Sequence, residues 1–162
     1  MKHLIVITLA VGALLFVLSS SCSFMNKLNA AQKIDEVATP IPFTTLENYF
    51  VRNDVDCSKQ QRLIINNKAD FEKYFGMAAY MGGMPTEVNW NKQFVIALVL
   101  PETKRATNIY PVAVKTTDND ILVFSYMVKR GDKISHSMVP FTAVAIDKPA
   151  SAKDMQIFFL EK

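Results

Sequence analysis

The chain has 162 residues, of which half are hydrophobic and one fifth are charged, and its formal net charge is +3. This nearly neutral balance argues against a nucleic-acid-binding protein, which carries a strongly basic face. Seven prolines and five glycines are too few for a low-complexity chain. The length suits one domain with a hydrophobic core of its own.

The beginning of the chain has the pattern of an export signal. Lys2 and His3 are a short positive start, residues 4–18 are apolar apart from Thr8, and three serines precede Cys22. A helix over residues 4–18 spans ~22 Å at ~1.5 Å per residue, which is less than the ~30 Å of a membrane's hydrocarbon layer. We therefore expect a cleaved signal rather than a permanent membrane span.

The sequence LSSSC at residues 18–22 resembles the cleavage site of a bacterial lipoprotein, with Leu18 one residue further from the cysteine than usual. The resemblance implies cleavage before Cys22, a diacylglycerol on its sulfur and a fatty acid such as palmitate on its new amino group. Several acyl chains anchor a protein stably, because each buried methylene contributes ~0.8 kcal/mol. Ser23 offers no inner-membrane retention signal, which favours the outer membrane of the cell envelope and its periplasmic or surface side.

Ordinary secretion is the alternative, in which Cys22 stays a free thiol able to pair with Cys57. If Cys22 is acylated, Cys57 has no partner within the chain, and no disulfide framework holds the fold. A lone thiol in an oxidising compartment is usually buried, and Cys57 has no histidine near it in sequence that would make it reactive.

The sequence predicts three parts. Residues 1–21 are the signal, residues 22–45 are a lipidated polar tether with Pro40 and Pro42, and residues 46–162 are a single globular domain.

The first predicted elements of the domain are an edge strand over residues 48–51, a strand over residues 62–66 and a helix that starts at Asn67. The Asn67 side chain can cap the amide of Asp70. Three aromatic residues fall on one face of this helix, which indicates core packing, and Gly76 is a suitable end. The aromatic positions are Phe71, Tyr74 and Phe75.

The later elements are strands separated by short loops. The run FVIALVL at residues 94–100 is apolar without alternation, which is typical of a strand covered on both faces. Pro111 must lie at a bulge, or its strand must be at an edge of the sheet there. Because short loops favour antiparallel neighbours, we predict an α+β domain with one main helix and an antiparallel sheet of about five or six strands, after the signal helix. The later strands are predicted over residues 107–116, 121–130, 139–146 and 155–160.

The inventory of catalytic side chains is thin. The mature chain has one histidine, His136, which lies between Ser135 and Ser137. It has neither paired cysteines nor the glycine-flanked serine of a nucleophile elbow, so we predict no metal, no cofactor and no enzyme. An enzyme that uses His136 with a neighbouring serine is the third hypothesis for function.

Basic side chains are predicted to gather at one end of the sheet. If the strands form a meander, the loops over residues 101–106 and 131–137 emerge together, away from the acidic Asp118, Asp120 and Asp147. We predict that this basic end docks an acidic protein partner or anionic headgroups, whereas the simpler alternative is that the charges only keep the loops soluble. The basic group consists of Lys104, Arg105, Lys129, Arg130, Lys133 and His136.

The order of these segments resembles a known family. RLIINNKADFEKYF is followed by NWNKQFVIALVLP and by PETKRATNIY, which ends in Tyr110. This looks like the PrcB C-terminal domain family, known from a lipoprotein subunit of a protease complex, over residues 62–160. The family's loop usually carries paired glycines, which are replaced here by Thr107, Asn108 and Ile109. The resemblance implies a non-enzymatic protease partner, with Tyr110 in a binding loop.

The first functional hypothesis is therefore a lipid-anchored, non-catalytic protein-binding or assembly module. The alternative is a small-ligand carrier or sensor, in which the methionine-rich residues 77–84 line an apolar cavity.

Overall fold

The computed structural model describes residues 33, 38–78, 83–117, 121–148 and 156–162. The signal helix, Cys22 and most of the predicted tether lie outside these residues, as do Asp118 and Asp120. The chain divides into two units, Met1–Val37 and Ala38–Lys162, and the second is the domain considered below. Among the described residues, no helix has the length and apolar character needed to cross a membrane.

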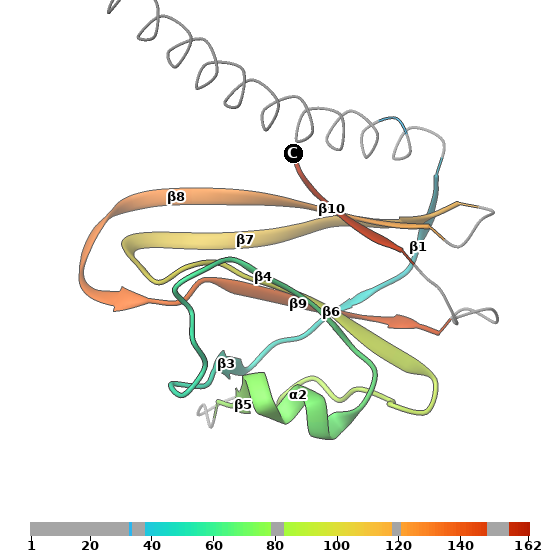
Figure 1. The fold of residues 1–162 in the computed structure, drawn as a ribbon, viewed down its shortest axis with the longest axis horizontal. Helices are drawn as coiled ribbons and strands as arrows, with labels where there is room; N and C mark the ends of the chain where they lie inside the picture. The colour runs from blue at the N-terminus through green and yellow to red at the C-terminus, as the bar shows by residue number, and fades with distance from the viewer. Residues whose placement is uncertain (1–32, 34–37, 79–82, 118–120, 149–155) are drawn as a thin grey trace, which may run out of the picture. The chain divides into compact units, whose positions relative to one another are not determined.

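The described part of the domain consists mostly of antiparallel β-sheets with a single short helix (Figure 1). The outer sheet has the order β1 (Thr39–Ile41), β7 (Thr103–Thr116), β8 (Leu122–Met138) and β10 (Ile157–Glu161). The central sheet has the order β2 (Thr44–Thr45), β9 (Phe141–Asp147), β6 (Gln93–Val99) and β4 (Gln61–Ile65). The small sheet pairs β3 (Tyr49–Val51) with β5 (Phe75–Met77). The described strand pairs are antiparallel except β8 with β10.

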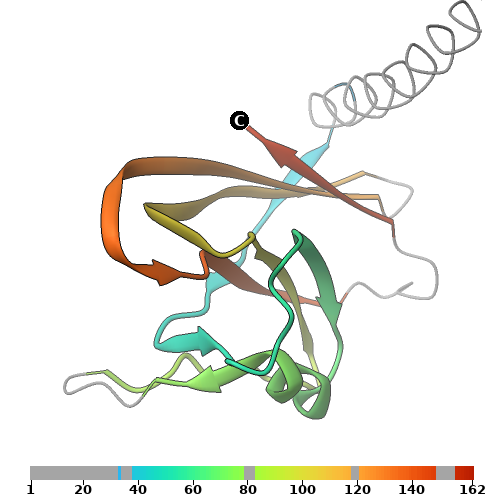
Figure 2. The ribbon, with the colours of Figure 1, turned by 60° about the vertical axis from the view of Figure 1, so that its left-hand side comes forward.

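Strand β6 explains why the domain has more than one sheet. Its side chains are buried on both faces, as its unbroken apolar sequence predicts. Phe94, Ile96 and Leu98 pack against the outer sheet, whereas alternate residues such as Val95 pack toward the helix. Figures 1 and 2 show the resulting order of outer sheet, central sheet, and a layer of α2 with the small sheet. The predicted single sheet is therefore wrong in its number of sheets, because each face of β6 needs a cover of its own.

The domain begins at Ala38 rather than at residue 46. Strand β1 pairs with β7, and β2 pairs with β9, so the last part of the predicted tether belongs to the fold. Both are edge strands, where proline is tolerated because one side of the backbone needs no ladder hydrogen bond. Pro40 lies within β1, and Pro42 lies where the chain passes from the outer sheet to the central sheet.

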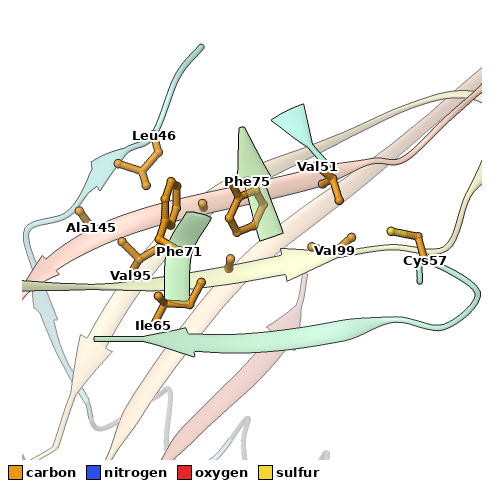
Figure 3. Close-up of a cluster of buried hydrophobic side chains, with 11 residues drawn as sticks. Leu46, Val51, Cys57, Ile65, Phe71, Phe75, Val95, Val99 and Ala145 are labelled. Carbon is orange, nitrogen blue, oxygen red and sulfur yellow. The ribbon is translucent and has the colours of Figure 1, made fainter. Parts of the chain in front are cut away.

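The helix α2 (Lys68–Tyr74) forms where the sequence predicts it. The side-chain oxygen of Asn67 accepts a hydrogen bond of 2.8 Å from the amide of Asp70, which confirms the predicted cap. Phe71 is buried against the central sheet, and Figure 3 shows it in the cluster with side chains from β4, β5 and β6. The helix ends at Tyr74 rather than at Gly76, because Phe75 is already extended and begins β5.

Replacing Asn67 by alanine is expected to lower the free energy of unfolding by about 1 kcal/mol, because the amide of Asp70 loses its acceptor at the end of a short helix. Urea denaturation followed by circular dichroism measures the change. Asn66→Ala is the matched control, since Asn66 is exposed directly before the cap and should alter stability by less than ~0.5 kcal/mol. Equal losses for both variants would show that the cap does not contribute.

Strands β7 and β8 are longer than predicted. The predicted loops over residues 101–106 and 131–137 are largely strand, because Thr103 pairs with Met138 and Arg105 pairs with Lys133. Both predicted alternatives for Pro111 hold: the register shifts between Pro111 and Ala113, and at Pro111 β7 pairs only with β8, since the pairing with β1 begins at Val114.

Candidate functional site

The predicted binding residues lie on two paired strands rather than in two loops. We define the basic ribbon as residues 103–112 of β7 together with residues 127–138 of β8. The polar sequence of β8 stays extended because its partner β7 anchors it, with Thr107 and Ile109 buried. In Figure 1 this end of β8 curves down from the outer sheet toward β9. All seven predicted residues are exposed on the ribbon: Lys104, Arg105, Tyr110, Lys129, Arg130, Lys133 and His136.

The outward face of the ribbon carries an exposed apolar pair. Tyr110 lies opposite Met127 in the register, and their exposed fractions are 46% and 48%. Two residues further along, Asn108 lies opposite Lys129. Paired residues of antiparallel strands share a face, and every second residue returns to it, so Lys129 stands beside the Tyr110–Met127 pair. The exposed Val112 follows Tyr110 across the bulge. The result is a small exposed apolar patch with a positively charged side chain beside it.

Only part of the ribbon's positive charge is compensated. Arg130 forms an ion pair of 3.8 Å with Glu161 of β10, and the Arg105 guanidinium donates to the carbonyl of Gly131 at 3.3 Å. Lys104, Lys129 and Lys133 have no ion-pair partner within the part of the chain that the structure describes. These three amines are free to meet the carboxylates of another molecule.

The residues of the enzyme hypothesis lie on the same ribbon. His136, Ser135 and Ser137 are all exposed within β8, in a stretch where the pairing with β7 is irregular, and no hydrogen bond joins the imidazole to either hydroxyl among the described residues. No group of three His, Cys, Asp or Glu side chains converges on a possible metal position among the described residues.

Cys57 is a buried free thiol, as the sequence predicts. Burial raises the pKa of the Cys57 thiol, and the nearby carboxylates of Asp56 and Glu102 raise this pKa further. Because the thiolate is the reactive form, the side chain is held in its unreactive state.

A pocket of about 520 Å³ opens on the helix side of the domain, between α2, the small sheet and the segment 84–90. Met77 and Met84 both line it, as the small-ligand hypothesis expects. Phe71 is central to its aromatic lining, with ring centroids 5.1 Å from Tyr49 and 5.5 Å from Trp90. The sequence indicated the aromatic face of α2 but gave no sign that Tyr49 and Trp90 meet it. The full lining is Tyr49, Arg52, Lys68, Phe71, Glu72, Phe75, Gly76, Met77, Met84, Pro85, Glu87, Val88 and Trp90.

No family model, no curated protein and no solved structure matches this chain. The similarity to the PrcB C-terminal domain family, and the role that it implies for Tyr110, therefore stay predictions.

Proposed function

We propose that this protein is a lipid-anchored lipoprotein of the cell envelope that acts as a non-catalytic protein-binding module. Its binding surface is the basic ribbon, and its partner is a protein with an acidic surface. The observation that carries the proposal is the position of Tyr110 and Met127, which lie paired and half-exposed beside Lys129. The exposed surface of both side chains is therefore available to a partner.

The chemistry of the ribbon matches that of protein interfaces. Tyrosine and methionine are enriched at such interfaces, and a tyrosine near the centre of one often carries much of the binding energy. Unpaired lysines around an apolar centre steer an oppositely charged partner and increase the rate of association. The fitting partner surface is a small apolar depression bordered by carboxylates.

The resemblance to the PrcB family supports a protease as that partner. In this family the position of Tyr110 lies in a loop, whereas here it lies in β7. Lipidation at Cys22 would hold the domain at the outer membrane, which confines the search for its partner to two dimensions.

The proposal is tested by crosslinking in intact cells, followed by affinity measurements with the recovered partner. Tyr110→Ala is expected to weaken binding by about 2 kcal/mol, which is roughly thirtyfold. Ile64→Ala is the matched control, because Ile64 is similarly exposed but lies on β4, outside the ribbon.

A charge-reversed pair tests the electrostatic part separately. Lys129→Glu with Lys133→Glu is expected to slow association and to reduce its dependence on salt concentration. Lys59→Glu with Lys92→Glu changes the net charge equally at exposed positions outside the ribbon and should bind normally. Recovery of the protein without any crosslinked partner, or equal binding by all variants, would refute the proposal.

A further inference from the structure

Two cations line the aromatic pocket on the helix side, Arg52 and Lys68, and both form ion pairs. The Arg52 guanidinium is held by Asp54 through two bonds of 3.0 Å. Lys68 faces Glu72 one helical turn away, with 3.6 Å between its amine and a carboxylate oxygen. Each of the two cations in the lining is thus paired with a carboxylate, that of Glu72 within the lining and that of Asp54 outside it.

Glu87 is the lining carboxylate that has no ion-pair partner among the described residues. Its negative charge acts on the adjacent wall. The pKa of Tyr49 is raised first by burial and second by the charge of Glu87. Because Arg52 is paired with Asp54 and Lys68 with Glu72, the charge left without an ion-pair partner is that of Glu87, which acts on the aromatic ring of Tyr49.

The wall that carries Glu87 is fixed before any ligand arrives. The Tyr49 hydroxyl donates to the Thr86 carbonyl at 2.9 Å, and the amide of Glu47 donates to the Thr86 hydroxyl at 3.0 Å. The amide of Asn48's side chain donates to the Met84 carbonyl at 3.1 Å. A wall tied to β3 in this way lowers the entropic cost of binding, because it does not have to be ordered by the ligand.

We infer that this pocket binds a small organic cation, an alkylammonium or quaternary ammonium compound with an apolar body. Tyr49, Phe71 and Trp90 make part of the lining aromatic, which suits a cation with an apolar body, and Glu87 supplies the opposite charge. The volume of about 520 Å³ lies within the range of about 300–1,000 Å³ of small-molecule sites. The site uses no residue of the basic ribbon, so it is independent of the proposed protein docking.

Three probes of nearly equal shape and different charge test this inference on the full chain in non-ionic detergent. The cation is choline, and the neutral probe is neohexanol, in which carbon replaces the nitrogen of choline. The anion is the carboxylate 3,3-dimethylbutanoate (tert-butylacetate). Trp90 is the chain's only tryptophan, so its fluorescence reports on the pocket. Choline is expected to change the fluorescence saturably and to bind at least about threefold more tightly than neohexanol, with tert-butylacetate weakest.

Two variants separate the contributions. Glu87→Gln is expected to weaken the binding of choline about two- to fivefold and to leave the binding of neohexanol unchanged. Glu102→Gln, at an exposed position outside the pocket, should change the affinity for neither probe. Tyr49→Leu removes a ring and is expected to reduce the preference for choline over neohexanol, since only the charge of Glu87 then favours the cation. Equal binding of the three probes, tighter binding of the anion, or a Glu87→Gln protein that binds choline normally would overturn the inference.

Discussion

Replacing Phe124 by alanine is expected to lower the free energy of unfolding by about 3–5 kcal/mol. Phe124 of β8 is fully buried in the cluster between the outer and central sheets. Its ring lies edge-on to Phe159 of β10 at 5.7 Å and beside Tyr126 at 5.9 Å. Those neighbours belong to hydrogen-bonded strands, so they cannot move inward to fill the space that the missing ring leaves.

Denaturation in urea, followed by circular dichroism and by Trp90 fluorescence, measures this loss. Trp90 packs on the helix side of the central sheet, so coincident transitions from the two signals would show that both clusters unfold together. Met127→Ala, three residues further along β8, is the control, because its half-exposed side chain should cost less than ~0.5 kcal/mol. A loss below ~1 kcal/mol for Phe124→Ala would mean that the two sheets do not pack as described.

Local signals in the sequence were sufficient for several elements. The uninterrupted apolar run of β6 predicts burial on both faces because every side chain of a strand must point to one face or the other. The cap at Asn67 depends only on residues within one turn of helix. Pro111 cannot donate a hydrogen bond to a ladder, and it lies next to a bulge where β7 pairs with β8 on one side only.

Elements that depend on distant partners were not predictable in the same way. Residues 131–138 of β8 are polar and contain Gly131, so their composition alone favours a loop. Their extended form comes from pairing with the beginning of β7, which lies about thirty residues earlier. The parallel pairing of β10 with β8 likewise has no local sequence signal.

The two candidate sites also differ in how far the sequence predicts them. The basic residues were expected at one end of the fold, and the structure does bring Arg105 beside Lys133, but on strands rather than on loops. The aromatic pocket combines Tyr49 of β3 with Glu87 and Trp90 of a loop. These residues are separated by about forty positions, and no spacing rule connects them, so only the packing of the small sheet against α2 reveals the pocket.

Replacing Cys22 by serine is expected to abolish the acylated, cleaved form of the protein completely. In the proposed anchor, acyl chains are attached through the sulfur and through the amino group that cleavage exposes, and serine provides no thioether. With ~0.8 kcal/mol for each buried methylene, several chains make membrane release negligible in the native protein. Incorporation of labelled palmitate and the mass of the intact protein measure the change. The variant is expected to be free of lipid, either as an uncleaved precursor that keeps residues 1–21 or in the soluble fraction.

Cys57→Ser is the matched control, because Cys57 is the chain's only other cysteine. This variant should keep its palmitate and its place in the membrane. Thiol titration adds a second, independent result: the denatured native protein should show one thiol, from Cys57, and the Cys57→Ser variant should show none, because the sulfur of Cys22 is already bonded. Two free thiols in the native protein, or palmitate on the Cys22→Ser variant, would contradict anchoring through Cys22. Binding by the ribbon would then have to be tested with a partner in solution, where both molecules diffuse in three dimensions and the lysines' steering matters more.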